Sequence, residues 1–210
     1  MPDLTLEAER FRDWAAALST DDGQWECMYE AWPALHAAVL TWAVGCATTA
    51  PPEDEVRQAL YAIARDNDTQ YLVSEIRKRD PEALHWLTRA ALAWGEEDAR
   101  WQLAVELGRL EPGDETESLL LALATDASEY VRRRSIRALT RIGSRAAEDL
   151  AWASWHRVDE NQEWARISAL GCLRYLKSPH FAALLAEALQ DERPYLRECA
   201  ERMRDEGVVG

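Results

Sequence analysis

Histidine and acidic residues at short spacings are the side chains that could perform acid–base or metal chemistry. Glu82 and His85 have the E-x-x-H spacing of a di-iron helix bundle, but such a site needs a second E-x-x-H pair and two further carboxylates. The sequence has no second copy. His156 precedes Asp159 and Glu160 and could form an acid–base pair with them, although a histidine at a helix end is also favoured by the helix dipole. We therefore predict no metal site and no cofactor.

The sequence also lacks the common motifs of nucleophilic catalysis and of phosphate binding. The sequence contains no G-x-S-x-G, G-x-G-x-x-G or Walker loop, so we expect a protein that is not an enzyme. The cysteines lie far apart and form no C-x-x-C pair, which predicts reduced and mostly buried thiols instead of a disulfide or metal site. They are Cys27, Cys46, Cys172 and Cys199.

Charge is unevenly distributed along the chain of 210 residues, which has a net charge of −14. Residues 1–60 carry −8, residues 61–126 carry −7 and residues 127–210 carry +1. An acidic surface repels nucleic acid and anionic membranes and attracts basic partners, and it also promotes solubility. No apolar run approaches the roughly 20 residues of a membrane span, and the acidic start lacks the layout of a signal peptide. We predict a cytoplasmic protein.

Apolar residues recur at three and four positions over most of the chain, which is the pattern of amphipathic α-helices. Gly, Pro, Asp and Asn separate these segments, as cap and turn residues do. Because the links are short, neighbouring helices should pack antiparallel. The predicted helices span residues 4–18, 33–46, 54–65, 69–79, 82–94, 97–110, 115–125, 129–142, 145–156, 162–177, 179–190 and 194–205.

A repeated motif organises the second half of the chain. One arginine recurs at gaps of 32, 34 and 31 residues, in Arg100, Arg132, Arg166 and Arg197. Acidic residues precede three of these positions: Asp126, Asp159 and Asp191. Such a period is typical of a repeat array. We predict an all-α fold, a right-handed α-solenoid of about five to six antiparallel helix pairs.

We expect a single domain over residues 1–210. Within it, 1–50 would be a divergent N-terminal cap, 51–96 degenerate units and 97–206 recognisable repeats. The motif Asp-x-x-x-Tyr-Val-Arg-x-x-Ser-Ile-x-Ala-Leu at 126–139 and its copies resemble HEAT repeats. The resemblance is in particular to the short bacterial kind found in phycobilisome-lyase-like proteins. The period is shorter than the about 40–47 residues of HEAT and armadillo repeats, a departure that leaves the exact repeat class open but not the helix-pair solenoid.

The arginines divide into a structural set and an extra set. The repeated arginines and acids are predicted to form an Asp–Arg ladder between successive turns, since the guanidinium fork can bridge carboxylates and carbonyls. Arg134, Arg137 and Arg141 share one helix face and with Arg145 form a basic stripe. The stripe is either a solvated face paired with acids such as Glu129 and Glu148 or a contact for an anionic ligand.

The resemblance also implies a binding face, because the second helix of each pair lines the concave surface of HEAT-like solenoids. In this sequence the concave helices would present Trp, Glu and Arg side chains. Such a surface suits protein recognition, since Trp and Arg are enriched among the residues that contribute most to binding at protein interfaces. Trp152 and Trp155 could equally be core residues. The candidate partner-binding residues are Trp86, Arg89, Glu148, Trp152, Trp155 and Glu187.

Three functions follow as hypotheses. The first is a non-enzymatic protein-binding α-solenoid, an immunity protein that neutralises a basic toxin, with capture speeded by electrostatic steering. The second, implied by the resemblance, is a bilin lyase or chaperone that holds a tetrapyrrole with Trp86, Trp152, Trp155 and His85. The third is a HEAT-like DNA glycosylase, which needs a strongly positive channel and is disfavoured by the net charge of −14.

Overall fold

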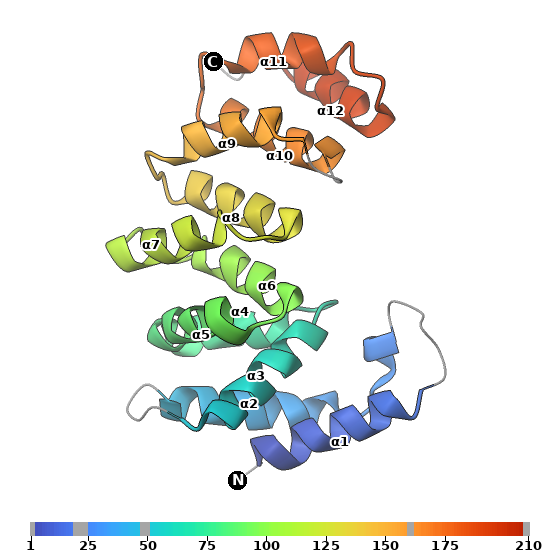
Figure 1. Ribbon diagram of the computed structural model, residues 1–210, viewed down its shortest axis with the longest axis vertical. Coiled ribbons are helices and arrows are strands. Elements are labelled where there is room, and N and C mark those ends of the chain that lie inside the picture. Colours follow the sequence, from blue (N-terminus) through green and yellow to red (C-terminus); the bar gives the residue numbers. More distant parts are fainter. Residues whose placement is uncertain (1–2, 19–24, 47–50, 159–161, 208–210) are drawn as a thin grey trace. The chain divides into compact units, whose positions relative to one another are not determined.

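The regular secondary structure is helical throughout the described part of the chain. The computed structural model describes residues 3–18, 25–46, 51–158 and 162–207, which form twelve α-helices and one 3-10 helix (Figure 1). The predicted all-α solenoid class is confirmed, and no helix bound differs from its prediction by more than three residues. None of the helices in these ranges is long and apolar enough to cross a membrane.

The helices follow one another with short links. Their bounds are α1 (Leu4–Ala16), η1 (Trp25–Met28), α2 (Trp32–Cys46), α3 (Glu53–Arg65), α4 (Tyr71–Arg79), α5 (Pro81–Trp94), α6 (Glu97–Leu107), α7 (Asp114–Leu123), α8 (Glu129–Arg141), α9 (Ala147–His156), α10 (Gln162–Tyr175), α11 (Phe181–Ala188) and α12 (Pro194–Asp205).

Two compact units make up the chain. Unit 1 is Met1–Leu110 and contains α1 to α6, and unit 2 is Glu111–Gly210 and contains α7 to α12. The boundary falls between α6 and α7, which is inside the predicted helix pair 97–125. The predicted single domain over 1–210 therefore stays a prediction, and each unit is described by itself.

Aromatic packing forms one end of unit 1. In this unit α1 packs on α2 and α3, and α3 packs on α6. Phe11 of α1 has no exposed surface, and its ring centroid lies 4.8 Å from that of Tyr29 and 5.0 Å from that of Trp32. Burial of such large rings contributes much of the hydrophobic stabilisation of a core. The buried Gln102 of α6 donates a 2.7 Å hydrogen bond to the Ile63 carbonyl of α3, which fixes the register of these two helices.

Unit 2 stacks helices from successive repeats. Helix α10 contacts both α8 and α12, α9 packs on α8 and α10, and α11 packs on α10 and α12. Buried apolar residues of the repeated motif, such as Val131, Leu139 and Leu173, face this interior. Trp155 of α9 is the largest of its fully buried side chains. The 3.6-residue apolar period therefore corresponds to one buried stripe on each helix.

Two turns of unit 2 are closed in the same way. Gly143 after α8 and Lys177 after α10 have positive φ angles of 75° and 54°, the left-handed conformation that ends many helices. The serine that follows each of them bonds to a glutamate of the preceding pair. Ser144 Oγ donates to Glu117 Oε1 at 2.5 Å, and Ser178 Oγ donates to Glu148 Oε1 at 2.7 Å. These serines connect successive repeats, which the sequence analysis did not foresee.

Candidate partner-binding surfaces

Three of the repeated arginines bind backbone carbonyls of the turn before their own helix. Arg132 Nη1 donates to the carbonyls of Asp126 and Ala127 at 2.8 and 2.6 Å, and Arg197 Nη1 donates to the Asp191 carbonyl at 2.9 Å. Arg100 donates in the same way to the carbonyl of Gly95. The guanidinium satisfies acceptors that a helix start leaves outside the helical ladder. These arginines hold the turns of the scaffold in place.

Arg166 makes the contact between repeats that the ladder predicted. Its Nε donates to the Trp155 carbonyl at 3.1 Å, and its Nη1 donates to Asp191 Oδ2 at 3.2 Å. Asp126 accepts from the backbone N–H of Ser128 at 2.9 Å. Asp159 lies outside the described residues. The ladder thus includes the Arg166–Asp191 carboxylate bridge and a set of arginine–carbonyl bonds.

The pKa of the Asp191 carboxyl is strongly lowered. Hydrogen bonds from the Arg193 side chain lower the pKa of the Asp191 carboxyl from 3.8 to about 2, against the opposing effect of partial burial. The Arg193 backbone N–H and the charges of Arg193 and Arg166 lower it further. Each of these groups stabilises the ionised form. Asp191 is therefore a charged structural link under ordinary conditions.

The predicted concave-face residues are distributed over both units, so each unit carries its own group. On α5 in unit 1, Trp86 is half-buried and its ring lies 5.9 Å from that of Trp42 in an edge-to-face contact. Arg89 is exposed on the same helix, and His85 is buried. Only Arg89 of these three residues has a largely accessible side chain.

On α9 of unit 2, two neighbouring tryptophans have different environments. Trp155 has no exposed surface, so its assignment to a partner-contacting surface is wrong. It is held by a 3.3 Å hydrogen bond from its Nε1 to Glu187 Oε2 and by the Arg166 guanidinium 5.0 Å from its ring centroid. Trp152 is half-buried, with its ring 4.4 Å from His156 and 4.2 Å from His180. Trp152 is thus partly accessible, and Glu187 is exposed on α11.

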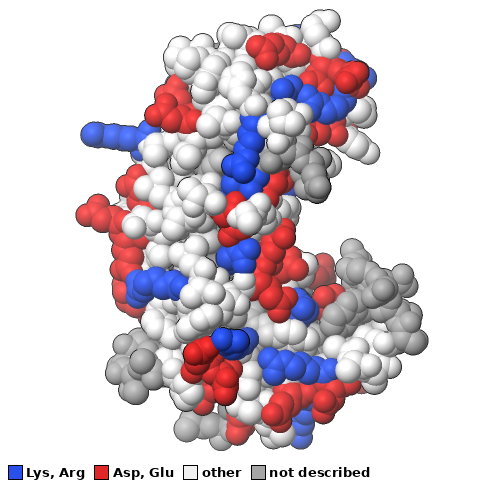
Figure 2. All heavy atoms as spheres, in the orientation of Figure 1, with Lys and Arg blue, Asp and Glu red and all other residues white. Residues whose placement is uncertain are grey.

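The basic stripe has one engaged member and three accessible ones. Arg134 donates to the Tyr130 hydroxyl, and its guanidinium lies 4.7 Å from the centre of that ring. Arg137, Arg141 and Arg145 are exposed and form no ion pair within the described ranges. On the face of the molecule shown in Figure 2, acidic and basic side chains are interspersed.

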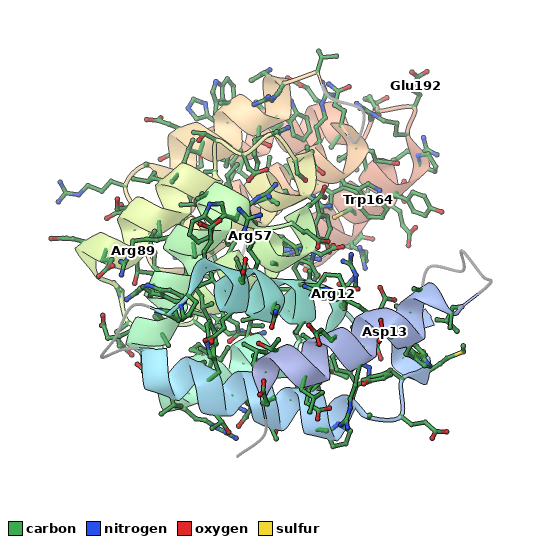
Figure 3. The ribbon with its side chains drawn as sticks, turned by 60° about the horizontal axis from the view of Figure 1, so that its bottom comes forward. Arg12, Asp13, Arg57, Arg89, Trp164 and Glu192 are labelled. Carbon is green, nitrogen blue, oxygen red and sulfur yellow. The ribbon has the colours of Figure 1, made fainter. Side chains whose placement is uncertain are left out.

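Three of the four repeated arginines have an aromatic residue two positions before them, and only the first of these, Tyr130, belongs to the motif from which the repeats were predicted. Tyr130, Trp164 and Tyr195 each stand two residues before a repeated arginine, so aligning the repeats on that arginine would have revealed them. Trp164, labelled in Figure 3, is 46% exposed and stacks on Tyr195 with ring centroids 5.6 Å apart. A pocket of about 420 Å³ is lined by Tyr130 and Trp164 together with Glu129 and Arg133.

These repeated contacts define a helical repeat array in unit 2, and a family comparison names it. Residues 116–203 match the family model of HEAT repeats. This HEAT-repeat segment begins within α7 and ends within α12, so it covers most of unit 2. No curated protein and no solved structure matches the chain. HEAT repeats commonly mediate protein binding through extended surfaces, and residues 116–203 of this chain are similar to them.

The match to HEAT repeats does not support the bilin hypothesis, because residues that maintain a fold say little about function. Two of the four residues proposed for tetrapyrrole contact, His85 and Trp155, are buried. The other two, Trp86 and Trp152, belong to different compact units. The finer resemblance to phycobilisome-lyase-like proteins stays a prediction.

Proposed function

We propose that this chain is a non-enzymatic binding protein that captures a basic protein partner through the acidic surface of unit 1. The supporting observation is the unequal pairing of charges in that unit. Residues 1–110 contain 20 acidic and 10 basic residues, a net charge of −10. Most basic side chains there are paired internally, while many exposed acids are not, and the uncompensated charge is negative.

Internal ion pairs account for most of the positive charge of unit 1. Arg65 bonds to Glu96 at 2.7 Å, and Arg77 bonds to the buried Glu106 at 2.6 Å. The carboxylates of six exposed acids form no hydrogen bond or ion pair with another described residue. They are Glu9, Asp13, Glu30, Asp54, Asp68 and Glu97.

Unpaired surface charge of one sign acts mainly on association. It speeds the encounter with an oppositely charged partner and lowers the affinity for like-charged surfaces. Within this function we propose an immunity protein, which would neutralise a basic toxin by covering its active surface. The acidic charge of unit 1 and the HEAT-repeat segment of unit 2 both support a scaffold of this kind.

The test is binding to individual proteins, beginning with the products of the genes that flank the gene for this chain. Each product is expressed alone and with this protein, and association is followed by surface plasmon resonance from about 50 to 500 mM salt. We expect one basic product to bind at micromolar affinity or better, with an association rate that falls as salt rises, and to be toxic only when expressed alone.

Two variants tie this binding to unit 1. Glu9 and Asp13 lie one turn apart on the same face of α1 (Asp13 is labelled in Figure 3). The double variant Glu9→Lys and Asp13→Lys should slow association about tenfold. Glu201→Lys, at an exposed position of α12 in unit 2, is the matched control and should change the rate little. If no flanking product binds and none is neutralised, the proposal is refuted.

A further inference from the structure

We propose that the pocket between α8 and α10 in unit 2 binds an extended, proline-containing peptide segment of a protein partner. The pocket is lined by Glu129, Tyr130, Arg133 and Trp164 and has a volume of about 420 Å³. Pockets of about 300–1,000 Å³ are typical of ligand sites. The inference rests on the proposed binding role, but it uses a surface of unit 2 that is separate from the acidic residues of unit 1.

The Glu129–Arg133 pair gives the pocket unused hydrogen-bonding capacity. Glu129 Oε1 accepts from Arg133 Nε at 2.8 Å, and the Glu129 side chain is only 9% exposed. Its Oε2 is buried and has no hydrogen-bond partner among the described residues. Leaving a buried acceptor unpaired is unfavourable. A ligand donor that reached this oxygen after a small rotation of the carboxylate would remove that cost.

Arg133 supplies the complementary groups. Its Nε is used by Glu129, whereas its two Nη groups make no hydrogen bond within the described ranges. An acceptor on Glu129 and donors on the adjacent Arg133 match the N–H and C=O of an amide. Because the two charges of the pair compensate one another, the matching ligand group is a neutral amide instead of an ion.

The aromatic rings of the pocket determine which peptide side chain can bind next to that amide. The guanidinium groups of Arg133 and Arg134 lie 4.6 and 4.7 Å from the centre of the Tyr130 ring and hold it in place. Trp164 provides the exposed ring surface, continued by Tyr195, which is 57% exposed. Exposed aromatic rings recognise proline in extended peptides, because a polyproline II segment keeps its backbone groups unbonded and loses little entropy on binding.

The repeat spacing fits the same ligand. Helices α8, α10 and α12 contact one another in succession, and packed helices lie about 8–10 Å apart. A polyproline II helix rises about 3.1 Å per residue with three residues per turn, so its side chains return to one face every ~9.3 Å. A peptide that crosses these helices would therefore present one side chain per turn to each of them, and Trp164 and Tyr195, stacked with ring centroids 5.6 Å apart, would form one aromatic surface for it.

A second, smaller pocket supports a chain-like ligand. It has a volume of about 90 Å³, shares Glu129 and Arg133 with the first pocket, and is lined on its far side by Ile136, Leu150 and Ala153. Two adjoining pockets, one with aromatic rings and one with aliphatic side chains beside Arg132 and Arg157, suit successive side chains of a peptide better than one compact small molecule. The shared ion pair lies where the peptide backbone would pass.

A defined probe tests this site. A fluorescein-labelled, terminally blocked peptide of four Pro-Pro-Ala repeats has a polyproline II conformation and one free N–H in every three residues. Its anisotropy is titrated with the full chain. Peptides of the same length made of Gly-Ser, of alternating Glu and Ala, and of alternating Lys and Ala serve as comparisons. We expect saturable binding of the Pro-Pro-Ala peptide and weaker binding of the other three.

Variants localise the binding. Trp164→Ala should weaken the Pro-Pro-Ala affinity about tenfold or more, as loss of an aromatic anchor does, and Arg133→Met should weaken it comparably. Tyr175→Ala is the matched control, since Tyr175 is 68% exposed on the same α10 but does not line the pocket; it should stay within about twofold of the native affinity. Thermal melting by circular dichroism establishes that each variant is folded.

Three outcomes would overturn the inference: no saturation up to about 1 mM protein, equal binding of the Gly-Ser or Glu-Ala peptide, or native affinity in a folded Trp164→Ala variant. The result is separable from that for the acidic surface. Binding of a basic flanking product without specific binding of the Pro-Pro-Ala peptide would leave the proposed function in place and overturn the inference about the pocket. Specific binding of the Pro-Pro-Ala peptide without binding of any basic flanking product would support the pocket and refute the proposed function.

Discussion

Replacing Asp191 by asparagine should destabilise unit 2 in a pH-dependent manner. Its carboxylate accepts hydrogen bonds from Arg193 Nε at 2.7 Å, Arg193 Nη2 at 2.6 Å and Arg166 Nη1 at 3.2 Å. A pKa shift from 3.8 to about 2 corresponds to about 2 kcal/mol at about 1.36 kcal/mol per unit. Since the carboxylate borders solvent and its interactions are screened, we expect about 1–2 kcal/mol.

The sign of the effect follows from the direction of the shift. The pKa of Asp191 is lower in the folded than in the unfolded chain, so ionisation favours folding. This contribution is fully present above the unfolded pKa of 3.8 and is lost as the pH falls through the folded value of about 2. Asparagine cannot ionise, and the stability of the Asp191→Asn variant lacks this component at every pH.

Urea unfolding followed by circular dichroism between pH 7 and pH 2 measures the difference. The free energy of unfolding of Asp191→Asn should be lower than that of the native chain by about 1–2 kcal/mol at pH 7, and the two should converge toward pH 2. Asp205→Asn, at a 68% exposed side chain on the last turn of α12, is the control and should change stability little. A difference of constant size down to pH 2, or none at pH 7, would refute the reasoning.

Three further predictions concern single positions of unit 2 and the thiols. Lys177→Gly should raise the free energy of unfolding by about 0.5–1 kcal/mol, because φ at Lys177 is 54°, and Gly143→Ala at the equivalent turn should lower it similarly; unchanged urea midpoints in both would contradict this. Trp155→Ala should cost about 3–5 kcal/mol and Trp155→Phe distinctly less, since the ring is fully buried, and equal urea midpoints would disprove its core role. Burial raises the pKa of the Cys172 thiol, so iodoacetamide at pH 8 should modify the exposed Cys27 first in the native protein; mass spectrometry showing equal rates would reject this.

Local patterns were sufficient to predict the helices. The apolar period and the turn residues gave all twelve α-helices. Asp80 lies at one of the expected turns and is the N-cap of α5, where its side chain accepts from the backbone N–H of Ala83. The α10 helix ends earlier than predicted, at Tyr175, because Lys177 adopts the left-handed conformation that a glycine would have indicated.

Side-chain environments were harder to predict, because helical periodicity does not distinguish a core stripe from a concave stripe. Trp152 and Trp155 lie three residues apart, yet one is half-buried against two histidines and the other is fully buried. Hydrogen bonds between repeats, such as Ser178 to Glu148, depend on three-dimensional stacking and leave no local pattern. The aromatic residues Tyr130, Trp164 and Tyr195 can be found from the sequence, but only when the repeats are aligned on their shared arginine.

The serine–glutamate and arginine–aspartate links of unit 2 bear on how such a chain can evolve. Ser144 to Glu117, Ser178 to Glu148 and Arg166 to Asp191 span 27, 30 and 25 residues of sequence. Each link joins one helix pair only to its immediate neighbour. Duplicating or deleting one whole pair would therefore regenerate a serine–glutamate link at the new junction. Unit 2 is built so that its length can change by whole-pair duplication without new stabilising contacts having to arise first.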